Sequence, residues 1–173
     1  ILKDAKTAGY LKEQPEPLKI KVVAKEKEIL TGSEQKKLCE ELQNSLNPKD
    51  LAIILGAATG LRLGEVLGLN LGDVDLEAGV LRVCRSRQRV TVKKGSKTSV
   101  QLASLKSRKS RRDIPINAPL MRIFEKYMAA LTGRSANAPL IWGHNKKALD
   151  SRTIQNHFSL LKKTHHLSSG VTF

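Results

Sequence analysis

Leucines recur every four residues in the first part of the chain that has a clear apolar stripe. Leu38, Leu42 and Leu46 share one face at this spacing, which is the periodicity of an amphipathic helix. Thr31-Gly-Ser-Glu34 precedes them, and a hydroxyl followed three residues later by a glutamate typically opens a helix. The sequence therefore predicts a helix over about 32–46.

Two further apolar stripes follow after short breaks. Asn47-Pro48 ends the first helix and begins the next, because proline is favoured in the first turn of a helix and disfavoured further in. Thr59-Gly60 then interrupts the pattern, and a third helix is expected over about 61–69. The residues expected to face the interior are Leu51, Ile54, Leu55, Ala58, Leu63, Val66 and Leu67.

Alternating residues then replace the helical stripe. Val80-Leu81-Arg82-Val83 follows the turn "DVDLEAG" as a short strand, and 89–92 and 100–105 are strand-like pieces around Lys94-Gly95-Ser96. Arg112-Asp-Ile-Pro-Ile116 is another short strand, which its proline confines to a sheet edge or to the strand end. We expect these pieces to form one small antiparallel sheet.

Helical patterns return in the last third of the chain. "NAPLMRIFEKYMAALTG" carries Pro119 near its start and Gly133 at its end, as helices commonly do. A final helix is expected over about 152–164, capped by Asp150 or Ser151. Helices with a small antiparallel sheet, rather than alternating strand–helix units, predict an α+β, mainly α, fold.

The N-terminal residues differ from the rest of the chain. Residues 1–14 read as the end of a preceding domain, and 15–30 as a proline-containing, charged interdomain linker. The main domain is expected to cover 31–173. The abrupt ends of the chain suggest a piece of a longer protein.

Positive charge is concentrated in one part of the chain. With 31 Lys+Arg against 16 Asp+Glu, the net charge is +15, which implies a polyanionic partner. No acidic residue occurs between Ala78 and Arg112. The basic residues of this stretch are Arg82, Arg85, Arg87, Arg89, Lys93, Lys94, Lys97, Lys106, Arg108, Lys109, Arg111 and Arg112. Because strand-like apolar residues are interleaved with them, we interpret the run as a folded surface for a phosphate backbone rather than a solvated basic face or a localisation signal.

Other classes of protein fit the sequence poorly. No apolar run approaches the roughly 20 residues needed to span a bilayer, so no membrane partner is expected. Cys39 and Cys84 lie far apart and match no metal-binding or redox spacing. The histidines likewise show no spacing typical of a metal site, and none is expected.

Arg62 is the one permanently charged residue in the apolar segment "AATGLRLGEVLGL". Burying an unpaired guanidinium is very costly. Glu65 follows three residues later on the same helical face and could hold it. At the start of a helix beside a basic sheet, Arg62 is a candidate ligand for a phosphodiester. A purely structural Arg–Glu pair would account for the same spacing.

Lys106 lies in "LASLKSRKSRRDIPI", where a strand ends in a turn. A lysine at such a tip can reach a bound phosphate, and neighbouring cations lower its pKa and suit it to donating a proton. Lys109 is an alternative for this function. Either lysine could instead contact backbone phosphates.

Taken together, these segments resemble the tyrosine recombinases, the integrases of phages and conjugative elements. "TGLRLGEVLGLNLGDVDLEAGVLRV" is similar to that family's first conserved box, and "LKSRKSRRDIPI" to its lysine hairpin. "ILTGSEQKKLCEEL" resembles the helix that opens the catalytic domain, and "SSGVTF" the phrase before the family's His-x-x-Arg box. The resemblance covers about Thr31 to Phe173 and includes the order and separation of the boxes.

The resemblance implies functions for individual residues. Arg62 falls on the first catalytic arginine, which contacts the non-bridging oxygens of the scissile phosphate, and Glu65 on the acid that supports it. Lys106 falls on the general acid for the 5′-hydroxyl leaving group. The residues expected to bind DNA are Arg85, Arg87, Arg89, Lys93, Lys94, Lys97, Arg108, Lys109, Arg111 and Arg112.

The resemblance also implies the reaction and its setting. The family's catalytic domain is of the DNA breaking-rejoining type and forms a 3′-phosphotyrosine bond without a metal, ATP or another cofactor. Its partner is double-stranded DNA, and a homotetramer assembles on paired sites. By this resemblance, residues 1–14 end the core-binding domain, and the parent protein is bacterial, cytoplasmic and nucleoid-associated.

The His-x-x-Arg box and the nucleophilic tyrosine of the family are expected to follow Phe173. Tyr10 and Tyr127 match no catalytic position and are expected to pack or to lie on the surface. This chain alone is therefore expected not to cleave DNA. The alternatives are a non-catalytic DNA-binding module with the same fold, and a related enzyme such as a type IB topoisomerase or a telomere resolvase.

Overall fold

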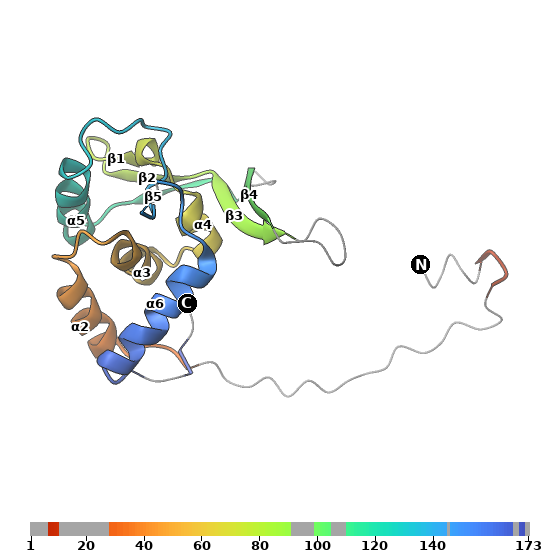
Figure 1. Ribbon diagram of the computed structural model, residues 1–173, viewed down its shortest axis with the longest axis horizontal. Helices are drawn as coiled ribbons and strands as arrows, with labels where there is room; N and C mark the ends of the chain where they lie inside the picture. Colours follow the sequence, from red (N-terminus) through yellow and green to blue (C-terminus); the bar gives the residue numbers. More distant parts are fainter. Residues whose placement is uncertain are drawn as a thin grey trace.

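Helices are the main regular elements of the molecule, and small antiparallel sheets lie beside them (Figure 1). The computed structural model describes residues 7–10, 28–90, 99–104, 110–144, 146–167 and 170–171. Its elements after the N-terminal residues are α2 (Gly32–Leu42), α3 (Pro48–Thr59), α4 (Leu63–Gly68), the 3-10 turn η1 (Leu71–Asp73), β1 (Val74–Asp75), β2 (Val80–Val83), β3 (Arg85–Val90), β4 (Ser99–Ser104), β5 (Arg112–Pro115), α5 (Ala118–Ala129) and α6 (Ser151–Thr164). The predicted α+β, mainly α, fold is confirmed.

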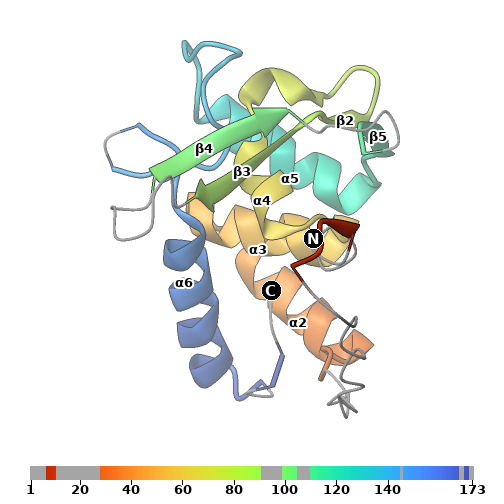
Figure 2. The same ribbon diagram turned by 90° about the vertical axis from the view of Figure 1, so that its right-hand side faces the viewer.

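The helix α3 lies at the centre of the core, between α2, α4 and α6 (Figure 2). Five consecutive side chains, Leu51 to Leu55, are each at most 2% exposed. A helix that is apolar all round is buried on every side. The helices α2, α4 and α6 pack around α3.

The start of α2 is as predicted, but its end is not. The Thr31 N–H donates to Glu34 Oε2 at 2.8 Å, and the Glu34 N–H donates to Thr31 Oγ1 at 3.3 Å, which is a complete capping box. The predicted end at Leu46 is wrong, because the helix stops at Leu42. Ser45 accepts the Asn47 N–H at 3.1 Å in a turn that prepares the next helix, and Leu46 is 54% exposed.

The strands form two ladders instead of one. β2 pairs antiparallel with β1 and with β5, whereas β3 pairs antiparallel with β4 alone. Cys84 separates β2 from β3, so the chain changes partner there. Figure 1 shows β3 and β4 projecting from the side of the helical body. We call this pair the ribbon.

The ribbon is attached to the body by a close approach between β3 and α4. A Cβ added at Gly64 would lie 2.7 Å from Ser86 Oγ, and one at Gly68 would lie 2.7 Å from the carbonyl oxygen of Arg85. Real Cβ atoms do not approach so closely, so only glycine lets the strand lie directly on the helix. Because Gly64 meets Ser86 and Gly68 meets Arg85, the helix and the strand run in opposite directions.

We predict that Gly68→Ala destabilises the protein by about 1–3 kcal/mol, because its methyl group would press on the backbone of β3. Unfolding in urea, followed by circular dichroism, measures the change. Gly32→Ala is the matched control, since nothing lies within 4 Å of a Cβ at that position. It should leave stability unchanged or raise it slightly. Equal destabilisation by both variants would contradict the close-packing argument.

Candidate functional site

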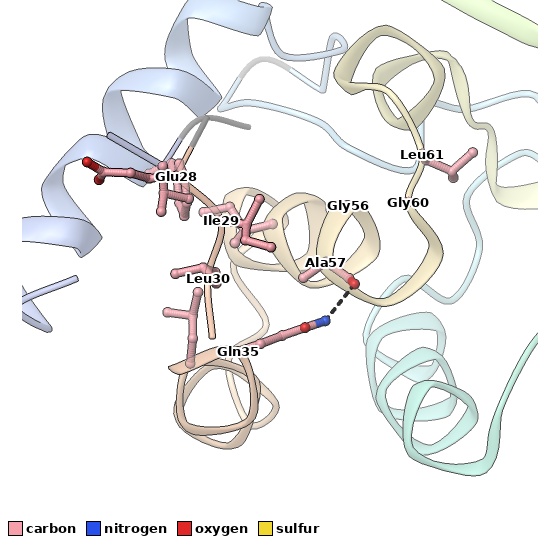
Figure 3. Close-up of a pocket in the computed structure, with 12 residues that line it drawn as sticks. Glu28, Ile29, Leu30, Gln35, Gly56, Ala57, Gly60 and Leu61 are labelled. Carbon is pink, nitrogen blue, oxygen red and sulfur yellow. Dashed lines mark hydrogen bonds between the residues drawn. The ribbon is translucent and has the colours of Figure 1, made fainter. Parts of the chain in front are cut away.

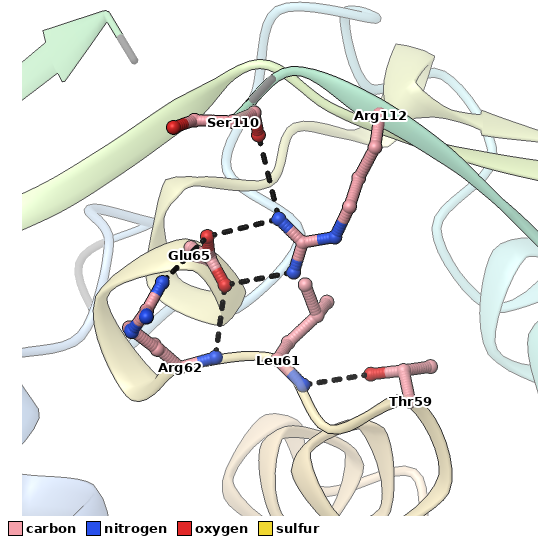
Figure 4. A network of polar contacts seen from close by, with 6 residues as sticks. All are labelled: Thr59, Leu61, Arg62, Glu65, Ser110 and Arg112. Atoms are coloured by element: carbon pink, nitrogen blue, oxygen red, sulfur yellow. Dashed lines mark hydrogen bonds and ion pairs between the residues drawn. The ribbon is translucent and has the colours of Figure 1, made fainter. Parts of the chain in front are cut away.

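Arg62 is presented to solvent by the short connection between α3 and α4. Gly60 ends α3 in the left-handed region, with φ 65°, and the Leu61 N–H donates to Thr59 Oγ1 at 3.3 Å. Leu61 is buried, at 4% exposure, whereas the Arg62 side chain is 88% exposed. Burial of the neighbouring leucine thus anchors the segment, and the guanidinium stays in water (Figure 4).

Glu65 is the buried carboxylate behind Arg62. Its side chain is 4% exposed, and its Oε2 accepts the backbone N–H of Arg62 at 2.9 Å. The Arg62 guanidinium lies 3.8 Å from Oε1, which is too far for a hydrogen bond. Glu65 therefore positions the backbone of Arg62 and leaves most of its guanidinium available.

The main partner of Glu65 is Arg112, at the start of β5. The two terminal nitrogens of Arg112 donate to the two oxygens of Glu65, each at 3.1 Å (Figure 4). This is the bidentate geometry that makes arginine–carboxylate pairs strong. The antiparallel pairing of Val83 with Arg112 brings β5 to this position. Sequence reasoning missed this contact because 47 positions separate the two residues and no local pattern links them.

These contacts keep the carboxylate charged. Burial by itself raises the pKa of Glu65, but the hydrogen bonds from Arg112 and from the Arg62 backbone, with the charges of both arginines, lower it below its ordinary value. The bond to Glu65 in turn raises the pKa of Arg112. The cluster thus carries two positive charges and one negative charge, and the exposed positive charge is that of Arg62.

The arginines of β3 are held by groups of the protein. Arg85 pairs with Asp73, and Arg89 pairs with Asp150. Arg87 donates through Nε to the carbonyl oxygen of Leu67 at 3.2 Å. These contacts fasten the ribbon to the body, so a DNA phosphate would have to compete for the guanidinium groups.

The other predicted DNA-binding residues are divided between the site and the undescribed segments. Arg112 belongs to the Glu65 cluster, and Arg111, beside it, is exposed. Lys93, Lys94, Lys97, Lys106, Arg108 and Lys109 lie outside the described residues. The choice between Lys106 and Lys109 as general acid stays a prediction.

Two lysines that sequence reasoning missed lie beside the ribbon. Lys146 and Lys147 are exposed and line a hollow of about 450 Å³ together with Arg87 and Val100. They were overlooked because they lie outside the acid-free stretch. Their place next to β3 and β4 extends the basic surface onto the segment before α6.

A second hollow, of about 430 Å³, is lined in part by Gly60 and Leu61, which directly precede Arg62 (Figure 3). Leu38, Ile53, Leu61 and Phe158 are among its lining residues, and Glu28 is the only ionisable side chain among the described residues that line it. The Glu28 carboxylate accepts the N–H of Gly170 at 3.0 Å. With no cation in its lining, this hollow does not suit a phosphate.

Tyr127 is a core residue. It is 2% exposed, and its hydroxyl donates to the carbonyl oxygen of Leu140 at 3.0 Å. Burial raises its pKa to about 12, so the phenol stays protonated. The expectation that Tyr127 packs in the protein is confirmed.

The histidines of α6 hold that helix against its neighbours. His157 Nε2 lies 2.6 Å from Asp50 Oδ1 on α3, and His165 Nδ1 lies 2.6 Å from Glu41 Oε2 at the end of α2. Within the described part of the chain, no cluster of three or more His, Cys, Asp or Glu side chains could hold a metal ion. No helix there is long and apolar enough to cross a membrane.

The sequence and the fold of this chain are both similar to those of known proteins. The model of the phage integrase family matches residues 28–173. The chain therefore belongs to the phage integrase family. A tyrosine recombinase XerC-like protein from Caldanaerobacter subterraneus subsp. tengcongensis is 32% identical over 103 residues, which cover 58% of this chain and 26% of that protein.

Solved structures of integrases have the same fold. The Tn1549 transposon integrase in complex with transposon right end DNA matches with a TM-score of 0.73 at 20% identity, over 99% of this chain and 60% of that one. A lambda integrase tetramer bound to a Holliday junction matches with a TM-score of 0.61 at 18% identity, over 96% of this chain and 44% of that one. The chain thus spans only part of each of these proteins.

We predict that Glu65→Gln destabilises the protein by about 2 kcal/mol, because it removes the counter-charge of Arg112 at a buried position. Chemical unfolding at neutral pH measures the change. Glu40→Gln is the matched control, since its partner Lys36 is 3.9 Å away and both side chains are more than half exposed. That substitution should cost less than about 0.5 kcal/mol. A Glu65→Gln effect as small as the control's would contradict the structural importance of the pair.

The same pair predicts a pH dependence. Because the pKa of Glu65 is lowered in the folded state, its stabilising contribution is fully present above the unfolded-state value of about 4.3 and is lost as the pH falls through the lower folded value. The stability difference between the natural protein and Glu65→Gln should therefore be constant from pH 8 to 5 and shrink below about pH 4. Urea unfolding of both proteins across this range measures it. A difference that grows on acidification would contradict the assignment.

Proposed function

We propose that the protein containing this chain is a site-specific tyrosine recombinase, an integrase that cleaves and rejoins DNA through a 3′-phosphotyrosine intermediate. Membership of the phage integrase family supports this proposal, and one observation carries it for the site. Arg62 is 88% exposed while its backbone is fixed by a carboxylate that is 4% exposed. A rigidly mounted, solvent-facing guanidinium suits the two non-bridging oxygens of a phosphodiester.

In this proposal each site residue has one task. Arg62 binds the scissile phosphate and stabilises the charge that develops on its oxygens. Glu65 and Arg112 position Arg62 without touching the substrate. The hydroxyl of a tyrosine of the longer protein attacks phosphorus and releases its proton to solvent. The bond between phosphorus and the 5′-oxygen breaks, and Lys106 donates a proton to that oxygen. No metal or other cofactor takes part.

The partner is double-stranded DNA, bound by the basic residues of the acid-free stretch other than Arg112 and by Lys146 and Lys147. A homotetramer on paired sites and a cytoplasmic, nucleoid-associated location belong to the same proposal. The family match from residue 28 onward supports a main domain beginning near residue 31, after a linker over 15–30 and the end of a core-binding domain over 1–14.

The test is covalent trapping with the longer protein on a nicked duplex, whose short released strand prevents rejoining. A protein–DNA adduct should accumulate, and Arg62→Ala should slow its formation by about 100-fold or more, because a donor to the reacting phosphate is lost. Arg122→Ala, which removes an exposed arginine of α5, is the control and should leave the rate unchanged.

An adduct that forms equally fast with Arg62→Ala would remove Arg62 from the reaction. DNA binding without any adduct from the longer protein would favour the alternative, a non-catalytic DNA-binding module with this fold.

A further inference from the structure

The ribbon has two different faces. Successive side chains of a strand point to opposite sides, and directly paired residues of neighbouring strands share a side. Arg87 pairs with Leu102 and Arg89 with Val100, whereas Gln88 pairs with Gln101. One face therefore carries the arginines, and the other carries only uncharged residues. We call the second one the glutamine face; it consists of Ser86, Gln88, Val90, Ser99, Gln101 and Ala103.

Residues of both faces contact α4. On the arginine face, Arg85 and Arg87 reach the carbonyl oxygens of Gly68 and Leu67, at the C-terminal end of the helix. On the glutamine face, Ser86 lies against Gly64, close after Arg62. Because β3 runs opposite to α4, the positions beyond Ser86 continue past the N-terminal end of the helix. We therefore infer that the outer part of the ribbon, with Gln88 and Gln101, extends beyond the end of α4 that presents Arg62.

Gln88 and Gln101 are the polar pair on this face. Both side chains are exposed, and they are directly opposite each other in the ladder. Neither amide forms a hydrogen bond with another residue that the structure describes. In contrast, the guanidinium groups of Arg85, Arg87 and Arg89 have partners within the protein.

We propose that Gln88 and Gln101 read base edges in the groove of the DNA whose phosphate lies at Arg62. This inference rests on the proposed function and deepens it, by naming specificity-determining residues. A two-stranded ribbon fits the major groove of DNA. There a glutamine amide can form a bidentate pair with adenine, in which its NH₂ group donates to N7 and its oxygen accepts from the N6 amino group. Directly paired side chains start about 5 Å apart, which places the two amides over neighbouring base pairs.

The surroundings of the pair favour DNA over other partners. No acidic residue occurs from Ala78 to Arg112, and the net charge of the chain is +15. Lys146 and Lys147 adjoin the arginine face of the ribbon. Positive charge on the opposite face and beside it would attract phosphates, and the uncharged glutamine face would meet the bases without repelling them. Phosphate contacts position a protein on DNA, whereas base contacts specify the sequence.

The experiment selects tight binders for the 173-residue chain from duplexes with a randomised segment, and then measures their affinities at several salt concentrations. The natural chain should enrich A·T pairs at one or two adjacent positions. Gln88→Ala and Gln101→Ala should each reduce the preference at one of these positions by about ten-fold, with the same dependence on salt, since no charge is changed. Gln43→Ala, an exposed glutamine of the α2 C-terminus, is the matched control and should keep every preference.

The outcomes separate this inference from the proposed function. Salt-dependent binding whose base preferences survive both glutamine substitutions, or binding with no base preference at all, overturns the inference and leaves the proposed function standing. Binding that is absent or does not depend on salt overturns both. Both side chains are exposed, so both variants should unfold at the same midpoint temperature as the natural chain. That result excludes a folding defect.

Discussion

The carboxylate of Glu65 is the group on which the candidate site depends. A buried charge is tolerated only when hydrogen bonds and opposite charges replace the lost water. Here the replacement comes from the Arg62 backbone and from both terminal nitrogens of Arg112. One side chain thus joins the start of α4 to the start of β5. The guanidinium of Arg62 forms no hydrogen bond with Glu65 and stays exposed, so a phosphate can reach it.

The ribbon depends on a second constraint, the close approach of β3 to α4. Gly64 and Gly68, one helical turn apart, allow the backbone of β3 and the small side chain of Ser86 to lie directly on the helix. The arginines of β3 then reach the last carbonyl groups of α4, where positive charge is favourable. A basic surface made of such residues both holds the fold together and attracts DNA. For this reason, the count of arginines in the acid-free stretch overstates the number available to phosphates.

Much of the fold could be predicted from local patterns. The capping box at Thr31, the proline at the start of α3 and the left-handed Gly60 are decided by residues close in the chain, so their signals are visible in the sequence. The end of α2 was misplaced because the leucine stripe continues to Leu46, while Ser45 and Asn47 form a turn that competes with the helix. The single predicted sheet became two ladders because alternation shows that a segment is extended and does not show which segment it pairs with.

The sequence by itself determined the mainly helical α+β fold, the segments that form the core and the strong positive charge, and it predicted Arg62 and Glu65 as site residues. Each of these follows from residue type and short-range spacing. Only the tertiary structure decided that Glu65 binds Arg112, that Arg85 and Arg89 of β3 are paired with Asp73 and Asp150, and that Gln88 and Gln101 share one face of the ribbon. These facts depend on which distant segments are brought together, because hydrogen bonds and burial act over a few ångströms in space and leave no periodic trace along the chain.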